Sequence, residues 1–308
     1  MTALLVTGLT GFVGSHLSQQ AQAADLCLDG KPVDLRDPAA VLAAVRSLQP
    51  KAVIHLAAQS SVALSIDDAD ETYRVNFTGT LNLLRALRDA GFQGRMLFVG
   101  SGDVYGSVRQ ELLPVTEDVP LRPRNPYGVS KVAAEALCYQ WSQSGPFEIV
   151  MARPFNHIGP GQSKQFAIAD FASQVAAYRR KSAAGVAGAS GSSQLRVGDI
   201  TATRDFTDVR DIVRAYLALL ESGVNGEAYN VCSGVERSLG DIIEALFDAG
   251  GVRMDIAIDP QRLRPSEQRR MLGSFAKLRA HTGWEPRIEL PQTLRDILAH
   301  CDEKASTP

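Results

Sequence analysis

Tyr127 and Lys131 lie four residues apart in the segment RNPYGVSKVAAEAL. Pro126 and the alanine-rich run after the tyrosine predict a helix that begins here, and helical spacing would place the phenol and the ammonium on one face. Free tyrosine and lysine side chains titrate near pH ~10 and ~10.4, too high for proton transfer at neutral pH. A neighbouring cation stabilises phenolate and lowers the pKa of a tyrosine. The pair is therefore suited to acid and base chemistry, although the same spacing also occurs on ordinary solvated helix faces.

The N-terminal segment predicts a strand, a glycine-rich turn and a helix. The apolar run ALLVTG ends at Gly8, and a helical stretch extends to about Gln22. Glycines spaced in this way let the backbone turn tightly and approach a pyrophosphate, while the helix N-terminus offers free N–H groups. We therefore predict a dinucleotide-binding turn, with the alternative of an ordinary turn with structural glycines. The predicted cofactor-binding residues are Gly8, Thr10, Gly11, Phe12, Val13 and Gly14.

Two further apolar segments are typical of buried parallel strands. The first, Ala52 to Leu56, runs into the small residues Ala57 and Ala58, which would let a cofactor lie close to its carboxyl end. His55 in this strand is expected to be a core residue or to lie just behind the site. The second strand, 96–99, delivers Ser101, Asp103 and Tyr105 at its carboxyl end. With a helix predicted over 73–91 between them, the alternation predicts an α/β fold with a doubly wound parallel sheet.

The composition is that of a globular protein without a nucleic-acid or membrane surface. The chain has 308 residues and a formal charge of −2, and no apolar run approaches the ~20 residues that span a bilayer. The N-terminus has no basic segment typical of a secretory signal, so we expect a cytoplasmic protein. Its four cysteines have no metal-like spacing, which predicts reduced thiols and no metal site.

The motifs GLTGFVG, HLAAQS, SGDVYG and YGVSK, in this order, resemble the extended short-chain dehydrogenase/reductase family, whose members act on nucleotide sugars. The resemblance covers essentially the whole chain. It implies that Tyr127 exchanges a proton at a sugar oxygen, that Lys131 holds the nicotinamide ribose and lowers the pKa of Tyr127, and that Ser101 hydrogen-bonds the same oxygen. Hydride would move between the nicotinamide of NADPH or NADH and a sugar carbon. Asn76 would support this site, or be an ordinary capping or surface asparagine.

Segments of the second half are similar to the GDP-mannose 4,6-dehydratases and, more closely, to the related GDP-4-keto-6-deoxy-mannose reductases. These segments are RPFNHIGPGQ, VGDITATRDFTDVRD, LRPSEQRRMLGSFAKL and TGWEPRIEL. Arginine suits a diphosphate because its planar guanidinium donates hydrogen bonds to two oxygens at once. A carboxylate accepts hydrogen bonds from ribose hydroxyls. The similarity implies substrate contacts by Gln59, Ser101, Asn156, Val197, Arg204, Arg264 and Glu267.

The resemblance implies reduction of the 4-keto group of GDP-4-keto-6-deoxy-D-mannose to GDP-D-rhamnose. A 4,6-dehydratase instead needs a carboxyl group that moves protons at C5 and C6, and the family's dehydratases have a glutamate two residues past the catalytic hydroxyl. Here Asp103 follows Ser101 and Gly102, so the carboxylate is one methylene shorter. This favours reduction, with Asp103 as a tentative catalytic residue. The dehydratase, a reductase that forms GDP-6-deoxy-D-talose, and a binding protein without catalysis are the alternatives.

The sequence does not distinguish NADH from NADPH as the cofactor. The resemblance places Asp34 and Leu35 against the adenine. A short second strand is expected in LCLDG, and Asp29 lies near the spacing of a ribose-binding acid, although a loop aspartate would look the same. No arginine lies there to meet a 2′-phosphate, so NADH and NADPH are both possible.

We predict a cofactor domain over 1–156, joined again by part of 205–235, and a sugar-nucleotide lobe over 157–204 and 236–308. The run Lys181 to Gln194 is rich in alanine, glycine and serine, which is typical of a surface insertion without chemistry. The helices over 75–90 and 127–144 carry more apolar surface than one sheet face needs, including Leu83, Leu137 and Trp141. We therefore expect a homodimer, with burial inside one chain as the alternative.

Overall fold

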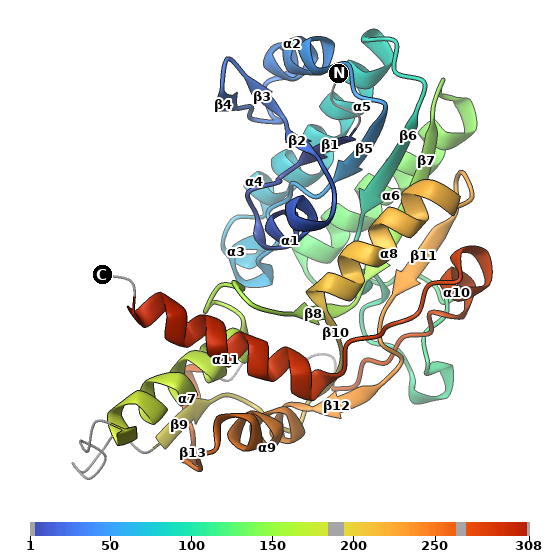
Figure 1. Cartoon of the computed structure of the whole chain (residues 1–308). Helices are drawn as coiled ribbons and strands as arrows, with labels where there is room; N and C mark the ends of the chain where they lie inside the picture. Colours follow the sequence, from blue (N-terminus) through green and yellow to red (C-terminus); the bar gives the residue numbers. More distant parts are fainter. Residues whose placement is uncertain (1–3, 184–193, 263–268, 307–308) are drawn as a thin grey trace.

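A six-stranded sheet, in which every neighbouring pair is parallel, forms one part of the molecule (Figure 1). The computed structural model describes residues 4–183, 194–262 and 269–306. The sheet has the order β11-β7-β6-β5-β1-β2. Its strands are β1 (Leu4–Thr7), β2 (Ala24–Asp25), β5 (Ala52–His55), β6 (Arg95–Val99), β7 (Glu148–Pro154) and β11 (Ala228–Val231). The predicted doubly wound parallel sheet is confirmed.

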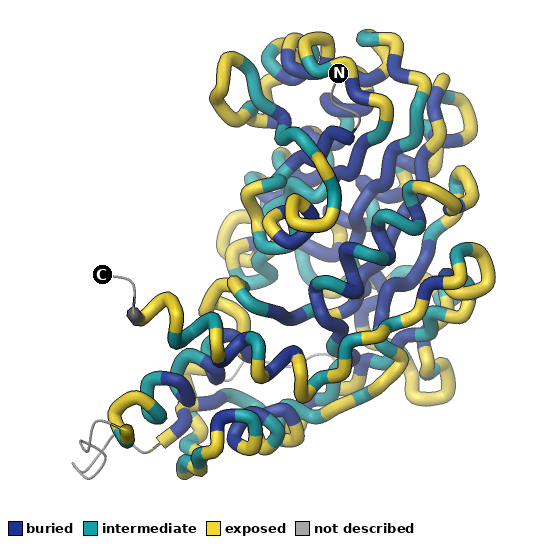
Figure 2. Tube along the Cα trace, viewed as in Figure 1, coloured by how far each residue is buried: buried dark blue, intermediate teal, exposed yellow. Residues whose placement is uncertain are grey.

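Helices cover both faces of this sheet, which explains why most side chains of its central strands are buried and apolar (Figure 2). Successive side chains of a strand point to opposite faces, and in β1 Leu5 packs on one face while Leu4 and Val6 pack on the other. The first face is covered by α2 (Pro38–Leu48), α5 (Gly79–Asp89) and α6 (Pro126–Ser144). The second is covered by α1 (Phe12–Gln20), α8 (Val209–Ser222) and α10 (Ala276–Thr282).

The expected second strand in LCLDG is wrong. The strand that pairs with β1 is the shorter β2, and the LCLDG segment instead forms an antiparallel hairpin of β3 (Cys27–Leu28) and β4 (Lys31–Pro32). Asp29 and Gly30 connect these two strands, with φ of 51° and 74°. An Asp-Gly pair with both φ angles positive is the favoured two-residue hairpin turn. This turn removes Asp29 from the end of the parallel strand.

The remaining strands belong to smaller sheets packed with three long helices (Figure 1). One sheet has the order β12-β10-β8, and β9 pairs in parallel with β13. A hydrophobic cluster joins these strands to the helices. The elements are β8 (Asn156–Ile158), β9 (Gln194–Val197), β10 (Thr203–Asp208), β12 (Glu236–Ser238), β13 (Asp255–Ile258), α7 (Ala167–Ala183), α9 (Leu239–Gly250) and α11 (Leu290–Ser306).

The short helices near the first sheet are α3 (Val62–Asp67), α4 (Ala69–Tyr73), a π-helical turn η1 (Arg74–Thr78), and the 3₁₀ turns η2 (Gly102–Tyr105) and η3 (Gln110–Leu112); a further 3₁₀ turn, η4 (Pro260–Arg262), follows β13. Within the described part of the chain, no helix is long and apolar enough to cross a membrane. All four cysteines are free thiols, and the described residues contain no cluster of metal ligands. Most of the expected insertion, 184–193, lies outside the described residues.

Candidate active site

Ser101, Tyr127 and Lys131 meet at the carboxyl end of β6. Ser101 caps the η2 turn directly after the strand, and its Oγ accepts a hydrogen bond of 3.2 Å from the backbone N–H of Asp103. That bond leaves the hydroxyl proton of Ser101 free to be donated. The serine lies close enough to the phenol of Tyr127 to act on its pKa as a hydrogen-bond partner. The structure therefore brings the predicted serine and tyrosine together.

The helix that carries the tyrosine begins as expected. Pro126 occupies its first turn, and the Asn125 side chain caps it by accepting a 2.7 Å hydrogen bond from the N–H of Gly128. Asparagine is a favoured N-cap because it satisfies a helix N–H that has no partner within the helix. The predicted α6 thus starts at the residue before Tyr127, which places the phenol at the edge of the sheet where β6 ends.

Lys131 is buried behind Tyr127. Its side chain is 5% exposed, and Nζ donates a 2.9 Å hydrogen bond to the carbonyl of Val99. The ammonium also lies 6.0 Å from the ring centroid of Tyr127 and 5.4 Å from that of Phe98. Burial lowers the pKa of Lys131 to about 8, because the charged form loses hydration. The cation is held by the end of β6 and by two aromatic rings.

The pKa of Tyr127 in this structure is shifted by burial, Asp103 and Ser101, and the lowering expected from Lys131 stays a prediction. The pKa of Tyr127 is raised, chiefly because the phenol is buried and further because the Asp103 carboxylate repels a phenolate. The serine lowers it, but not enough to offset these effects. A phenol with a raised pKa keeps its proton at neutral pH. Tyr127 is thus a proton donor in this structure rather than a base.

Asp103 and Arg204 are in electrostatic range of each other across the site. Burial raises the pKa of the Asp103 carboxyl, and the charge of Arg204 lowers it by less. Arg204 lies on β10, is half-buried, and donates a 2.7 Å hydrogen bond from Nη1 to the carbonyl of Thr203. Burial lowers the pKa of the guanidinium, and no carboxylate among the described residues forms an ion pair with it.

Tyr105, by contrast, faces the core, where its hydroxyl bonds to Asn230 at 2.7 Å.

The glycine turn has the geometry that a dinucleotide needs. Gly8 has a φ of 79°, and a Cβ there would lie 3.1 Å from the backbone of Ala57. A Cβ at Gly14 would lie 2.4 Å from the carbonyl of Leu9. Gly11 caps α1 without any side-chain hydrogen bond, so the first N–H groups of the helix are open to an anion. These residues fit the pyrophosphate of a nicotinamide dinucleotide. Thr10, Phe12 and Val13 lie in the same turn and first helical turn.

Asp25 is a functional candidate that the sequence reasoning missed. Its Oδ1 accepts hydrogen bonds from the N–H of Gly8 at 3.2 Å and of Leu26 at 2.8 Å, and it is the last residue of β2. An acid at the end of the second parallel strand is the usual partner of the adenosine ribose. Asp29, the residue considered for this place, is exposed in the hairpin. The available signal was that Asp25 is the first acid after α1.

The other predicted cofactor residues surround the glycine turn or the strands beside it. Leu56, Ala57 and Ala58 follow β5, and the N–H groups of Leu56 and Ala57 bond to the backbone and hydroxyl of Thr7. Leu35 is buried in the core against Gly79. The carboxylate of Asp34 is bound by Arg36, which lowers its pKa. Adenine contacts by these two residues stay a prediction.

Asn76 lies in a buried network that reaches the catalytic helix. It is 2% exposed and lies in the π-helical turn η1, a feature often found at functional sites. Its Oδ1 accepts from the N–H of Gln59 at 2.8 Å, and its Nδ2 donates to the Gln59 carbonyl at 3.0 Å and to Ser130 Oγ at 2.9 Å. Ser130 Oγ in turn donates to the carbonyl of Tyr127 at 2.7 Å. The capping or surface interpretation of Asn76 is therefore excluded.

His55 extends this network to β1, and its tautomer follows from its partners. The hydroxyl of Thr80 donates to the Asn76 carbonyl at 2.6 Å, so it must accept from His55 Nε2, 3.0 Å away. His55 Nδ1 is then the acceptor for the hydroxyl of Thr7 at 2.7 Å. Burial, with a smaller effect of Lys131, lowers the pKa of His55 to about 3. The imidazole is neutral and connects β5 and β1 to Thr80 on α5, whose hydroxyl in turn bonds to Asn76 of η1.

The predicted substrate residues lie in different environments. Asn156 is exposed at the start of β8. The side-chain amide of Gln59 is engaged by Ser61 and Thr72. Val197 is fully buried in the core of the smaller sheets, which leaves no side-chain surface for a ligand. Arg264 and Glu267 lie outside the described residues.

Comparisons with known proteins identify the relatives of this chain. The model of the GDP-mannose 4,6 dehydratase family matches residues 28–297. A GDP-6-deoxy-D-mannose reductase of Pseudomonas aeruginosa is 46% identical over 305 residues, which are 98% of this chain and 97% of that protein. A GDP-mannose 4,6-dehydratase of Sordaria araneosa is 29% identical over 290 residues, covering 86% of this chain and 50% of that protein.

Solved structures agree with these sequence relatives. The structure of RMD from Pseudomonas aeruginosa complexed with NADPH superposes with a TM-score of 0.90 at 44% identity, covering 99% of this chain and 100% of that chain. A putative epimerase from Burkholderia cenocepacia has a TM-score of 0.83 at 34% identity and 98% coverage of both chains. The chain therefore belongs to the GDP-mannose 4,6-dehydratase family, within the extended short-chain dehydrogenases/reductases.

Proposed function

We propose that this protein reduces the 4-keto group of GDP-4-keto-6-deoxy-D-mannose to GDP-D-rhamnose, with NADPH or NADH as the reductant. The observation that carries the proposal is the meeting of Ser101, Tyr127 and Lys131 at the carboxyl end of β6. It is supported by 46% identity, over nearly the full length, to a protein named GDP-6-deoxy-D-mannose reductase. The homologous structure with NADPH supports the cofactor class.

The residues that would hold the cofactor are those of the glycine turn, the α1 N-terminus and Lys131. When bound, a reduced nicotinamide supplies hydride to a carbonyl carbon. Gly8, Gly11 and Gly14 let the backbone approach the pyrophosphate, whose oxygens would accept hydrogen bonds from the free helix N–H groups. Lys131, buried and charged below about pH 8, would bind hydroxyls of the nicotinamide ribose.

Tyr127 and Ser101 would supply the proton and a hydrogen bond to the carbonyl oxygen of the substrate. A carbonyl oxygen that gains negative charge is stabilised by hydrogen-bond donors placed beforehand. Ser101 can donate its hydroxyl proton, since the bond from the Asp103 N–H uses only an acceptor lone pair of Oγ. Tyr127 has a raised pKa and so retains a proton to give to the developing alkoxide. This direction of transfer suits reduction.

Substrate binding is proposed for Arg204 and Asn156. Arg204 is a half-buried guanidinium without an ion-pair partner among the described residues, so a diphosphate would supply the missing anion. Asn156 is exposed at the start of β8, which pairs in parallel with the strand of Arg204. Gln59, Arg264 and Glu267 stay as proposed contacts that rest on the family resemblance alone. A contact by Val197 would have to come from its backbone, because its side chain is fully buried.

The runner-up is a 4,6-dehydratase, and Asp103 is the observation that favours it. Burial raises the pKa of this carboxyl, which brings it closer to the range in which a carboxyl group serves as a general acid. Purified protein given GDP-mannose and oxidised cofactor would then form a 4-keto-6-deoxy product without added reductant. No such product is expected here, and its appearance would contradict a simple reductase.

The reductase is tested with the 4-keto sugar itself. We expect the protein to oxidise NADPH or NADH, followed by absorbance, only when GDP-4-keto-6-deoxy-D-mannose is present. Proton NMR of the product then separates GDP-D-rhamnose from its 4-epimer GDP-6-deoxy-D-talose. If the protein binds the GDP-sugar but oxidises neither cofactor, it is a binding protein without catalysis. Wild type and the Tyr127→Phe variant would then behave alike in the assay.

We also propose a homodimer formed through α6. Val129 and Tyr139 are 41% and 54% exposed on this helix. Tyr139 lines a hollow of about 260 Å³ together with Val132, Ala136 and Met151. Of the residues expected at the interface, Leu83 is fully buried inside the chain, so its assignment is wrong. Leu137 and Trp141 are partly buried and pack against the hydrophobic cluster that contains Leu83. Light scattering on wild type and a Tyr139→Glu variant tests the dimer, which a monomeric wild type would refute.

Two further proposals rest mainly on the sequence. The cofactor domain over 1–156 with part of 205–235 is supported by the return of α8 and β11 to the first sheet. The substrate lobe would then comprise 157–204 and 236–308, except that α10 within the second range packs on the first sheet. A cytoplasmic location is proposed because nucleotide sugars and reduced nicotinamide cofactors are available there, and cell fractionation tests it.

A further inference from the structure

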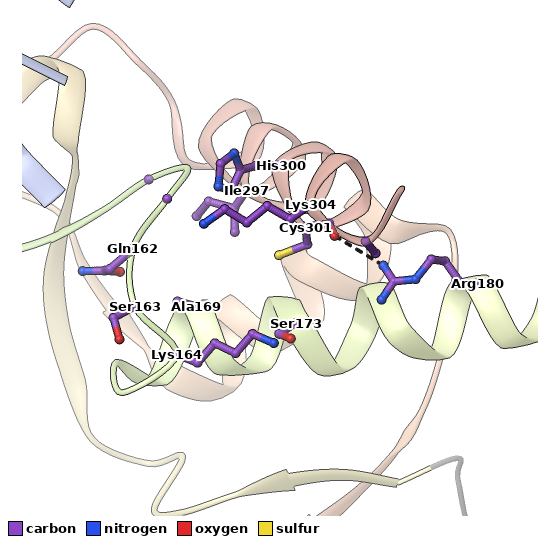
Figure 3. A pocket seen from close by; sticks show the side chains of 13 residues that line it. Gln162, Ser163, Lys164, Ala169, Ser173, Arg180, Ile297, His300, Cys301 and Lys304 are labelled. Carbon is purple, nitrogen blue, oxygen red and sulfur yellow. Dashed lines mark hydrogen bonds between the residues drawn. The ribbon is translucent and has the colours of Figure 1, made fainter. Parts of the chain in front are cut away.

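A cavity of about 360 Å³ lies between the loop after β8, the helix α7 and the helix α11 (Figure 3). Its size is at the lower end of the range of small-molecule sites, roughly 300–1,000 Å³. None of its lining residues has a role in the site described above.

The cavity is basic. Lys164, Arg180 and Lys304 line it together with His300, and none of the described lining residues is acidic. Figure 3 shows Lys304 and His300 projecting from α11 toward the loop, while Lys164 extends along α7 to Ser173. Arg180 is paired with Asp302 at 2.9 Å. Lys164 and Lys304 have no ion-pair partner among the residues that the structure describes. Two ammonium groups are thus left for an external anion.

The imidazole of His300 contributes further polar groups to the cavity. Its Nε2 is buried and has no hydrogen-bond partner within the described chain, and buried polar atoms of this kind are uncommon in folded proteins. Burial and the nearby charge of Lys304 lower the pKa of this imidazole, so it can offer one donor and one acceptor to a neutral or anionic group. The hydroxyls of Ser163 and Ser173 add further donors at the rim. The floor is apolar, with Ala169 and Ile297.

We propose that this cavity binds a small phosphorylated molecule. Phosphate oxygens accept from ammonium, hydroxyl and imidazole groups, and such charge-assisted bonds are short and strong. The apolar floor would cover the ester part of a sugar phosphate or a nucleotide. Both molecules present the same phosphate chemistry to the lysines, so the chemistry of the cavity does not separate them.

The loop that closes the cavity also contacts the cofactor half of the molecule. The carbonyl of Pro160 accepts a 2.8 Å hydrogen bond from Nε2 of His16, which lies on α1. The same loop begins after Ile158, the last residue of β8, and Asn156 is the first residue of that strand. An occupant would therefore be held by a segment that joins the glycine-turn helix to the proposed substrate residue.

Cys301 provides a local probe of occupancy. It lines the cavity and is half-buried, and among the other cysteines only Cys27 is similarly accessible. In a Cys27→Ser background, the rate of thiol alkylation therefore reports on the cavity rather than on the active site. Three probes are compared: inorganic phosphate, glucose 1-phosphate and GMP. The matched variants are Lys164→Gln/Lys304→Gln and, for equal loss of charge at exposed sites elsewhere, Lys31→Gln/Lys51→Gln.

We expect at least one probe at millimolar concentration to slow alkylation of Cys301 severalfold in a saturable way. The Lys164→Gln/Lys304→Gln variant should bind it about tenfold more weakly, while the Lys31→Gln/Lys51→Gln variant should behave as wild type. The probe that protects best identifies the class of phosphate compound. The proposal is overturned if no probe protects Cys301, or if protection is the same in both lysine variants.

Discussion

Asn76 and Ser130, 54 residues apart in the chain, are joined by a 2.9 Å hydrogen bond from Nδ2 to Oγ. The bond connects a buried π-helical turn to the helix that carries Tyr127 and Lys131. Because the Asn76 amide also makes two bonds to the Gln59 backbone, it fixes the segment after β5 relative to the catalytic helix. This relationship gives the asparagine a positioning role in the proposed reduction.

Replacement of Asn76 should impair catalysis more than replacement of Ser130. Asn76→Ala leaves the Gln59 N–H and carbonyl without partners, and each buried group left unpaired costs about 1–3 kcal/mol. We expect kcat to fall by about 10-fold or more, with a smaller change in KM. Ser130→Ala removes only the link to the helix and should lie between wild type and Asn76→Ala. Equal kcat values in wild type and Asn76→Ala, measured on folded proteins, would contradict the positioning role.

His55 should make the protein less stable as the pH falls. Its folded pKa of about 3 lies below the ordinary value of 6.5, so below about pH 6.5 the unfolded chain takes up a proton that the folded chain refuses. Unfolding free energy should therefore drop by about 1 kcal/mol from this residue between about pH 7 and about pH 5.5. A His55→Gln variant keeps one donor and one acceptor and should lack this contribution. Urea titrations of both proteins at the two pH values measure the difference, and parallel losses would argue against a neutral buried imidazole.

Lys131 should limit the reaction at alkaline pH. The pKa of this residue is lowered to about 8, so the ammonium that holds the ribose is lost as the pH rises through that value. We expect kcat/KM for carbonyl reduction to fall about tenfold per pH unit above about pH 8. Lys131→Arg keeps its charge at all accessible pH values, so any residual activity should not show this fall. A wild-type profile that stays flat up to about pH 10 would show that Lys131 titrates elsewhere.

Asp25 should favour NADH over NADPH. Its carboxylate lies at the end of β2 and bonds to Gly8, where a second negative charge on the 2′-phosphate would be repelled. Asp25→Asn retains the acceptor oxygen and removes the charge, so the ratio of kcat/KM for NADPH to that for NADH should rise about fivefold, or ~1 kcal/mol. Asp29→Asn, in the exposed hairpin turn, is the control and should leave the ratio unchanged. An identical shift in both variants would mean that the net charge of the surface, rather than Asp25, determines preference.

The parallel sheet was predictable because its signals are local. Apolar strands such as Ala52–His55 and Arg95–Val99, separated by a helical pattern, are sufficient to indicate a doubly wound sheet. The two-residue strand β2 has no periodicity to detect, and the Asp-Gly turn beside it was not recognised as a hairpin. Prediction of Asp25 failed for the same reason, because its role follows from where that short strand ends.

The composition of the proposed site was predictable, but its electrostatics were not. The spacing of Tyr127 and Lys131 indicates a shared helix face, and their proximity is confirmed. The direction of the pKa change at Tyr127 depends on burial and on Asp103, which no sequence pattern reveals. In the same way, contacts over long sequence separations, such as Asn76 with Ser130, arise only when the helices pack.

Reduction with a deuterated cofactor tests the central claim most directly. Purified protein is mixed with GDP-4-keto-6-deoxy-D-mannose and NADPH or NADH that carries deuterium at the transferred position, and the product is examined by NMR. The proposed function predicts GDP-D-rhamnose with one deuterium at C4, formed by wild type and nearly abolished in Tyr127→Phe. A product without deuterium at C4, or equal turnover by Tyr127→Phe, would contradict it.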